Sequence, residues 1–468
     1  MQIKLTFLGA AQRVTGSRYL LEAGDERVLI ECGLCQEREC RERDWEPFPI
    51  PPESINAILI THAHLDHCGF LPRIVKLGFR GAVYCTGATA ELAKIILMDS
   101  AKLMEEDAEF KKKRHEREGR KVAHPEIPLY TIEDAENSFK YISPIKYRQS
   151  VKVTKNIEAV FYNAGHVLGS SDIKITIRNG GDQKTILFSG DVGSEGRPII
   201  TDPDSGLEAD YVLVESTYGD RTIVNHNTVA DRLAEIINTT EKAGGNIVIP
   251  SFALERAQDI LYYINKLLLE DRIPHLMVFV DSPMAVNITE VFERHPELYD
   301  EEMKELVQRH LSPFRFADLK FTRTVDESKA INHIKGTVII IAGSGMCTGG
   351  RIKHHLVTNI SRPESTILFV GYQAIGTLGR QIADGISPVR ILGQYYPVKA
   401  RIEKLDGLSS HADREQLLTW VSRLKRPPRK IFVVHGEPES ATSFATLIRE
   451  QLGWKTSVPS YKDTAILN

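Results

Sequence analysis

The chain has 468 residues, of which 42% are hydrophobic and 26% charged, and a formal net charge of -3. This balance is typical of a globular protein with a large buried core, and it excludes a disordered or low-complexity chain. The near-neutral charge neither indicates nor excludes a polyanionic partner, because a local basic groove can lie on a near-neutral body.

The sequence contains no run of about 18 apolar residues, and its short apolar N-terminal stretch is followed by Arg13 and Arg18. Neither a membrane span nor a signal peptide is therefore expected. Six cysteines in a chain of this length do not form a disulfide framework, which indicates a reducing compartment, so we expect a cytoplasmic location. Cys32, Cys35 and Cys40 lie close together, but no second ligand pair follows at zinc-finger spacing. We interpret them as small buried residues beside a turn.

Residues 1–218 alternate short β-rich segments with longer connections. Strands are predicted, in chain order, at KLTFLGA, SRYLLEAG, RVLIECG, AILITHA, AVYCTG, IEAVFYNAG, DIKITIRNG and KTILFSGD. Two segments have helical periodicity, residues 88–113 and the later IEDAENSFKYI.

From residue 219 to about 395, strand-like segments alternate regularly with helical ones. NIVIP, LMVFVDSP, TVIIIAGSG and STILFVGY each lead into an amphipathic helix. Such a series predicts a parallel sheet with helices packed on it. Residues 396–468 then return to the first type of pattern. We therefore predict an α/β body formed by residues 1–218 and 396–468, with an inserted parallel-sheet α/β domain formed by residues 219–395.

The segment THAHLDHCG places three histidines and one aspartate directly after the strand-like AILI. Because side chains repeat every second residue along a strand, His62 and His64 lie on one face. The following turn brings Asp66 and His67 to the same point. Neutral imidazoles and carboxylates are the usual ligands of catalytic zinc. A solvated histidine-rich turn is the alternative, and the density of ligand types at a strand end argues against it.

Further ligands are expected at other strand ends. His166 in NAGHVLGSS, Asp191 in ILFSGDVG and His435 in IFVVHGE each follow an apolar run and precede glycine. Alone, each would be interpreted as a turn residue. Together with the first motif they predict a site that holds two metal ions.

These motifs resemble those of the metallo-β-lactamase superfamily. Glu215 in VESTYGD, His411 in LSSHAD and His435 in VVHGE match the three further motifs of its β-CASP branch. Similar stretches are PSFALERAQDIL, VDSPMA, GSGMCTGGR and GYQAIGTLGRQ, so the resemblance covers nearly the whole chain. The chain resembles the β-CASP ribonucleases of bacteria and archaea and the endonuclease subunit of the mRNA 3′-end cleavage complex. The resemblance implies a metallo-β-lactamase αββα sandwich with an inserted β-CASP domain.

The resemblance also implies roles for individual residues. One Zn²⁺ would be held by three histidines and a second by Asp66 with two more histidines, and Asp191 would bridge the two ions. The implied ligands are His62, His64, Asp66, His67, His166, Asp191 and His435. Asp66 would also count among the catalytic residues. The metals would lower the pKa of the attacking water, His411 would protonate the leaving oxygen, and Glu215 would orient His411.

The glycine-rich segment GSGMCTGGRIKHH is predicted to contact the substrate phosphate. Backbone N–H groups at a strand-to-helix turn can cradle an anion, although a plain turn is an equally good interpretation of the sequence alone. In the family this loop faces the scissile phosphate, so Ser344, Gly345 and Arg351 are the expected substrate-binding residues, with Arg380 a weaker one. The basic segment KKKRHEREGRK at 111–121 either contacts RNA or forms a solvated helix end.

The sequence departs from the family pattern at two positions. Glu31 in IECG stands where relatives have Asp, and its longer carboxylate is expected to adjust a metal-binding histidine without binding the metal itself. Glu255 in PSFALER stands where many relatives have Gly. It adds a charge at the start of a helix of the inserted domain.

We predict a zinc-dependent ribonuclease that hydrolyses phosphodiester bonds of single-stranded RNA, as an endonuclease or also as a 5′-exonuclease. The substrate would thread a cleft between the body and the insert, which suits a flexible single strand. A homodimer is plausible. Three alternatives stay open: a DNA nuclease of the same branch, a small-molecule metallo-hydrolase of thioesterase or lactonase type, and an inactive scaffold.

Overall fold

The computed structural model describes residues 2–37, 39–118, 126–222 and 228–468. The chain folds into two compact units. Unit 1 consists of Met1–Glu195, Asp202–Thr222 and His411–Asn468, and unit 2 consists of Gly196–Thr201 and Ile223–Ser410. The domain ranges 1–218, 219–395 and 396–468 stay a prediction.

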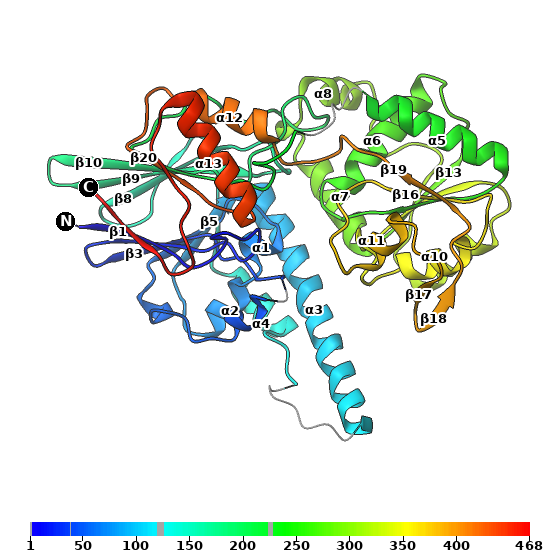
Figure 1. Cartoon of the computed structure of the whole chain (residues 1–468), viewed down its shortest axis with the longest axis horizontal. Coiled ribbons are helices and arrows are strands. Elements are labelled where there is room, and N and C mark those ends of the chain that lie inside the picture. Colours follow the sequence, from blue (N-terminus) through cyan, green and yellow to red (C-terminus); the bar gives the residue numbers. More distant parts are fainter. Residues whose placement is uncertain (1, 38, 119–125, 223–227) are drawn as a thin grey trace. The chain divides into compact units, whose positions relative to one another are not determined.

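Within the described residues, unit 1 contains two mixed β-sheets that pack face to face (Figure 1). The first sheet has the order β22 (Thr464–Leu467), β1 (Ile3–Phe7), β2 (Tyr19–Ala23), β3 (Glu26–Ile30), β4 (Ala57–Leu59), β5 (Ala82–Thr86), β6 (Ile142–Ile145). The second has the order β21 (Thr456–Ser457), β20 (Lys430–Val433), β11 (Tyr211–Val214), β10 (Asp182–Phe188), β9 (Ser171–Asn179), β8 (Ile157–Asn163), β7 (Ser150–Lys152).

Alternating burial along the strands explains why the two sheets associate. In β1, Ile3, Leu5 and Phe7 are buried, while the residues between them are half-buried. Side chains of the two sheets meet in one apolar core, in which the rings of Phe7 and Phe432 lie 5.3 Å apart. Burial of such apolar surface is the dominant favourable contribution to folding. This core fixes the strand ends on which the polar motifs lie.

Helices cover the outer faces of both sheets. Figure 1 shows α12 and α13 on one side of the sandwich and α2 and α4 on the other. The helices of unit 1 are α1 (Leu65–Cys68), α2 (Leu71–Lys76), α3 (Gly87–Glu118), α4 (Ile132–Phe139), α12 (Arg414–Ser422) and α13 (Pro438–Leu452), with short 3₁₀ helices at Arg41–Asp44 and Pro52–Ser54. Trp420 of α12 and Phe444 of α13 pack on Val214 and Val433 of the second sheet. The predicted αββα sandwich is thus confirmed.

Helix α3 is longer than its predicted range 88–113. It continues to Glu118. Exposed ion pairs four residues apart stabilise the turns just before this extension, with Lys111 2.5 Å from Asp107 and Lys113 2.5 Å from Glu109. Such pairs stabilise an isolated helix by about 0.2–0.5 kcal/mol each. No helix of the described ranges is both long and apolar enough to span a membrane.

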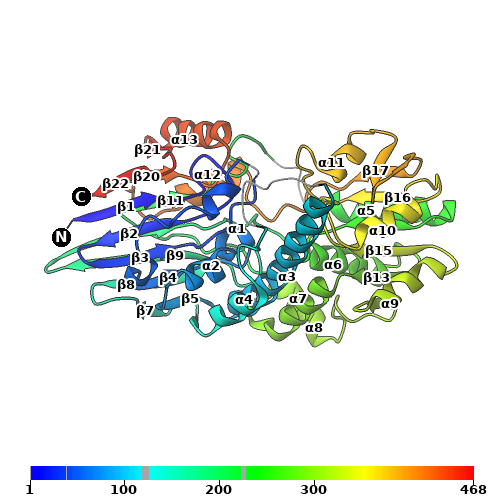
Figure 2. The same ribbon diagram turned by 90° about the horizontal axis from the view of Figure 1, so that it is seen from below.

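Unit 2 contains the predicted all-parallel sheet, which is visible in Figure 2. Its order is β14 (Leu319–Phe321), β13 (Met277–Asp281), β15 (Val338–Ala342), β12 (Ile247–Pro250), β16 (Thr366–Phe369), β19 (Arg401–Lys404), beside a hairpin of β17 (Val389–Ile391) and β18 (Gln394–Tyr396). The helices are α5 (Val229–Ala243), α6 (Arg256–Leu269), α7 (Pro283–Arg294), α8 (Glu301–Gln308), α9 (Val325–Ala330), α10 (Ile352–Asn359) and α11 (Leu378–Ala383), with 3₁₀ turns at Pro296–Leu298 and Ile331–His333.

The central strands of this sheet are buried on both faces. Every residue of β12 and β15 is buried, as expected when helices cover both sides of a parallel sheet. The register aligns Pro250, Ala342 and Asp281 at the ends of β12, β15 and β13. The loops that follow these strands therefore start from one edge of the sheet.

Candidate metal centre

The first motif follows β4. His62 and His64 lie in the loop after the strand and not on it as predicted, because β4 ends at Leu59, and Asp66 and His67 lie in the short helix α1. Backbone bonds anchor α1 to the neighbouring segment, because Ser17 N–H donates to Asp66 O at 2.8 Å and Cys32 N–H donates to His67 O at 2.8 Å. A side chain at Gly33 would collide with this backbone, since its Cβ would lie 1.6 Å from Asp66 O. The glycine of IECG thus allows the close approach that holds α1 at the strand ends.

His166 and Asp191 reach the same point from two loops of the second sheet. His166 lies between β8 and β9, and Asp191 follows β10. Gly193 allows these loops to touch, because a Cβ there would lie 1.9 Å from Gly165 O. His435 follows β20, with its N–H donating to Ala10 O at 2.7 Å. All seven predicted ligands therefore come together within unit 1.

The ligand atoms form two neighbouring groups. In each group the atoms lie within 4.8 Å of one another. The first comprises His62, His64, His166 and Asp191; the second comprises Asp66, His67 and His435. His62 Nε2 lies 3.0 Å from His64 Nδ1, and His67 Nε2 lies 3.1 Å from His435 Nε2. At such distances, two imidazole nitrogens can both bind one cation placed between them.

Asp191 lies between the groups and presents one oxygen to each. Its Oδ2 is 3.6 Å from His62 Nε2 and 3.5 Å from His166 Nε2. Its Oδ1 is 3.3 Å from His67 Nε2 and 3.5 Å from His435 Nδ1. Oδ1 is buried and accepts no hydrogen bond of normal geometry from the described residues. A buried carboxylate oxygen that accepts no hydrogen bond usually binds a cation.

The protonation states also fit metal binding. Burial lowers the pKa of His62 well below its ordinary value and that of His64 to about 4, so both imidazoles are neutral and have a free lone pair. His67 differs, because burial lowers its pKa but Asp191 and Asp66 raise it well above the ordinary value. Those carboxylates attract any positive charge, so a divalent cation competes with that proton. The residues present therefore fit a zinc centre.

Glu215 and His411 form a pair beside this centre. His411 Nδ1 lies 3.2 Å from one Glu215 oxygen and 3.9 Å from Asp191 Oδ2. Glu215 is fully buried, and its Oε1 accepts the N–H of Val192 at 2.6 Å. Burial would lower the pKa of His411, but the charge and hydrogen bond of Glu215 raise it to about 9. Asp413 caps α12 and fixes the chain just after His411. Glu215 also lies near Asp191 and His435 in a third set of possible ligands.

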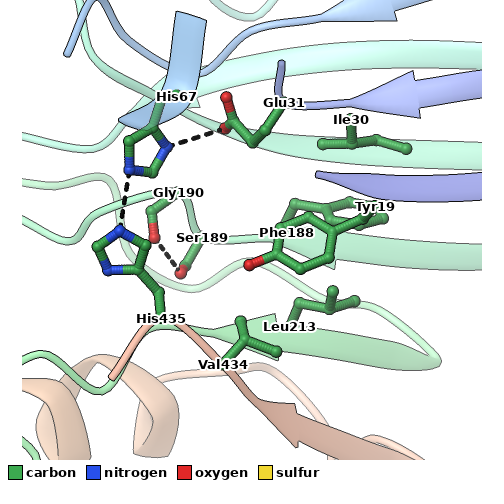
Figure 3. Close-up of a pocket in the computed structure, with 10 residues that line it drawn as sticks. All are labelled: Tyr19, Ile30, Glu31, His67, Phe188, Ser189, Gly190, Leu213, Val434 and His435. Atoms are coloured by element: carbon green, nitrogen blue, oxygen red, sulfur yellow. Dashed lines mark hydrogen bonds and ion pairs between the residues drawn. The ribbon is translucent and has the colours of Figure 1, made fainter. Parts of the chain in front are cut away.

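Glu31 lies behind His67 at a small cavity (Figure 3). Its Oε1 is 3.5 Å from His67 Nδ1, the nitrogen that faces away from His435. Glu31 belongs to neither of the two histidine-rich groups. Figure 3 shows His67 between Glu31 and His435, so this carboxylate orients the imidazole.

The expected substrate-binding residues lie in unit 2, in the turn between β15 and α10. The Ser344 hydroxyl accepts the N–H groups of Thr348 at 3.0 Å and Gly349 at 3.2 Å, so it closes the turn on itself. Arg351 already has partners, because its guanidinium donates to Asp281 at 2.7 Å and to Arg323 O at 2.7 Å. Arg380 pairs with Asp384 at 2.7 Å. A phosphate would have to compete with Asp281 for Arg351.

Three further sequence features have a structural counterpart. Glu255 adopts φ 67, the region that glycine prefers, and its carboxylate lies 3.3 Å from Arg197. The substitution for glycine therefore keeps the backbone shape and adds a buried ion pair.

The basic segment 111–121 continues α3 as an exposed helix end to Glu118, and its residues 119–121 lie outside the described ranges. Cys35 and Cys40 form a disulfide that the sequence analysis did not predict.

Sequence reasoning missed two hydroxyl groups that support the histidines. Thr61 Oγ1 lies 3.0 Å from His62 Nδ1, and Thr217 Oγ1 lies 3.1 Å from His435 Nδ1. Thr61 directly precedes His62, and Thr217 lies two positions after Glu215. Threonines are common at strand ends, so their pattern carries no signal that distinguishes them.

Comparisons with known proteins agree with this geometry. Three family models match the chain: "Metallo-beta-lactamase superfamily domain" at residues 20–189, "Beta-Casp domain" at 257–382 and "Zn-dependent metallo-hydrolase RNA specificity domain" at 395–459. Ribonuclease TTHA0252 of Thermus thermophilus is 36% identical over 95% of this chain and 96% of its own length. Transcription termination factor FttA of Methanocaldococcus jannaschii is 30% identical over 98% of this chain and 71% of its own length.

One solved structure shares the fold along its whole length. A protein of unknown function from Enterococcus faecalis matches 100% of both chains with a TM-score of 0.54 at 12% sequence identity. That likeness concerns the fold alone. The relatives, the family models and the ligand groups together lead to one assignment. The chain belongs to the β-CASP branch of the metallo-β-lactamase superfamily, a family of zinc-dependent hydrolases.

Proposed function

We propose that this protein is a ribonuclease that hydrolyses phosphodiester bonds of single-stranded RNA. The RNA specificity domain at residues 395–459 and the ribonuclease relative at 36% identity support this substrate. A flexible single strand can adapt its backbone to a buried site more easily than a duplex can.

Two zinc ions per chain are part of this proposal. His62, His64 and His166 would hold one ion, and Asp66, His67 and His435 would hold the other. Asp191 would bridge them, which is supported by the separate orientation of its two oxygens toward the two groups. When bound, zinc supplies the Lewis-acid charge that phosphodiester hydrolysis needs at neutral pH. Glu31 and the two threonines orient the histidines that face them.

His411 is the proposed proton donor to the leaving oxygen. This role rests on the convergence of the Glu215–His411 pair with Asp191, which is the observation that carries the proposal. Glu215 accepts from Nδ1 of His411, and this leaves Nε2 as the nitrogen that can donate to the substrate. Asp66 would be both a metal ligand and a catalytic residue. Ser344, Gly345 and Arg351 stay the proposed contacts to the substrate backbone.

Cleavage of labelled substrates tests the proposal. Wild-type protein and His67→Ala are incubated with single-stranded RNA, single-stranded DNA and a thioester, and His275→Ala serves as a matched control because its side chain is 76% exposed. We expect the wild type and His275→Ala to cut RNA, and His67→Ala to lose activity and zinc. Preference for DNA or the thioester would overturn the RNA assignment, and equal cutting by His67→Ala would overturn the metal site.

Circular RNA separates the two modes of attack. An endonuclease opens a circle, whereas a 5′-exonuclease needs an end. We propose endonuclease action, with 5′-exonuclease action as an additional mode that is detected as mononucleotide release from 5′-monophosphorylated RNA.

A further inference from the structure

The carboxyl edge of the parallel sheet in unit 2 brings three loops together. They follow β12 (Ser251–Glu255), β15 (Gly343–Arg351) and β16 (Val370–Thr377). These strands are neighbours in the order β15-β12-β16. In open α/β sheets, ligands bind outside the carboxyl ends of the strands. Side chains exposed at this edge are therefore placed where a ligand of unit 2 would lie.

Phe252 is the exposed aromatic residue of the central loop. It is 45% exposed, although it lies between the buried residues Ser251 and Ala253. The neighbouring Gly345 is shaped around it, because a Cβ at Gly345 would lie 2.8 Å from ring atom Cδ2 and 3.0 Å from Phe252 N. Gly345 thus leaves room for the ring, of which a large part stays exposed.

Hydrogen bonds anchor the turn that contains Gly345. Gln373 Nε2 donates to Gly345 O at 3.0 Å from the loop after β16. At the far end of the turn, Arg351 donates to the buried Asp281 at 2.7 Å. Asp281 also accepts from Ser328 Oγ at 2.5 Å and lies 2.6 Å from His355 Nε2. These contacts anchor both ends of the turn against which Phe252 lies.

We propose that Phe252 is a stacking platform for one base of single-stranded RNA. This inference rests on the proposed function and adds a base contact to its substrate site. An aromatic face stacks on any base and therefore suits an enzyme with a broad RNA substrate. Asp281 does not oppose this ligand, because Arg351 compensates its charge at 2.7 Å.

Equilibrium binding of labelled oligouridine tests the platform. It is measured at one fixed salt concentration with zinc-loaded protein that carries Glu215→Gln to prevent cleavage, with and without Phe252→Ala. We expect Phe252→Ala to weaken binding about 10-fold or more, since removal of a stacking aromatic typically has that effect. Phe252→Trp should bind like the parent. Tyr395→Ala is the matched control, because Tyr395 is 69% exposed on the hairpin of unit 2.

An oligomer of the same length without bases separates stacking from backbone contacts. Phe252→Ala should change its affinity less than about 2-fold, because the ring then has no base to lose. An unchanged oligouridine affinity of Phe252→Ala, or an equal loss for both oligomers, would overturn the platform. Failure of the parent protein to bind any RNA would overturn the proposed function as well. Thermal unfolding of each variant checks that the fold is retained.

Discussion

The imidazole of His411 lies 3.2 Å from the carboxylate of Glu215, although 196 residues separate the two in the chain. Glu215 directly follows β11, and His411 precedes α12. Backbone bonds hold the pair together, because Ala412 N–H donates to Val192 O at 2.8 Å and Val192 N–H donates to Glu215. This arrangement places the two side chains as one pair beside the candidate metal ligands.

We expect Glu215→Gln and His411→Ala each to lower kcat for RNA cleavage by about 10²–10⁴-fold, because both remove oriented proton transfer. The double variant should be no slower than the slower single variant, since residues that act as a unit are non-additive. Single-turnover kinetics measures this. Zinc content should stay at the wild-type level, and loss of zinc in Glu215→Gln would identify Glu215 as a ligand instead.

Removal of zinc should destabilise the protein. The buried carboxylates Asp191, Glu215 and Glu31 then lose the positive charge that compensates them. Zinc at 100 times its dissociation constant stabilises a folded protein by about 2.7 kcal/mol, so the midpoint of thermal unfolding should fall on chelation and recover on zinc addition. His166→Ala should respond much less to the chelator than His275→Ala. An equal response of the two would contradict the site.

Arg197 should be essential for the stability of unit 2. It is buried and donates to Asp259 at 2.9 Å and to Glu255 at 3.3 Å. We expect Arg197→Ala to lower the free energy of unfolding by about 3 kcal/mol, because it removes a charged partner of two buried carboxylates, of which Asp259 keeps Arg256 at 3.7 Å. Glu255→Gly should cost much less, since glycine adopts φ 67 without strain. Denaturant unfolding of both variants compares the two losses, and a larger loss for Glu255→Gly would refute this account.

The contribution of Asp281 should depend on pH. Burial alone would raise its pKa, but hydrogen bonds from His355, Ser328, Thr322 and Arg351 hold it below the ordinary value. A carboxyl group whose folded pKa is depressed stabilises the protein fully above its unfolded pKa of about 3.9, and this contribution is lost as the pH falls through the folded pKa. The difference in unfolding free energy between wild type and Asp281→Asn should therefore be constant near neutrality and shrink below about pH 4. A difference that grows in acid would contradict this assignment.

The convergence of the candidate ligands was predictable because these residues share one local signal. His62, His166, Asp191 and His435 each follow an apolar strand, and strand ends of packed sheets meet. The periodicity of the second half likewise predicted the parallel sheet. The family resemblance was needed for Glu215 and His411, because a lone strand-end carboxylate and a histidine before a helix are common without function.

Pairings between distant side chains were not predictable in this way. Arg351 is a plausible phosphate ligand in the sequence, but its partner Asp281 lies 70 positions earlier and is recognisable only in the fold. The contact of Gly345 with Phe252 is of the same kind. Such contacts depend on loop geometry, which hydrophobic patterns do not encode.

The order in which the ligands occur along the chain has a consequence for biosynthesis. His62 to Asp191 are made early, whereas His411 and His435 lie after the whole of unit 2. Strand β20, which carries His435 at its end, inserts beside β11 only after more than 200 further residues have been joined. Under the proposed function, a chain still attached to the ribosome before that point would lack both His411 and His435 and would be unable to cut RNA until its synthesis is nearly finished.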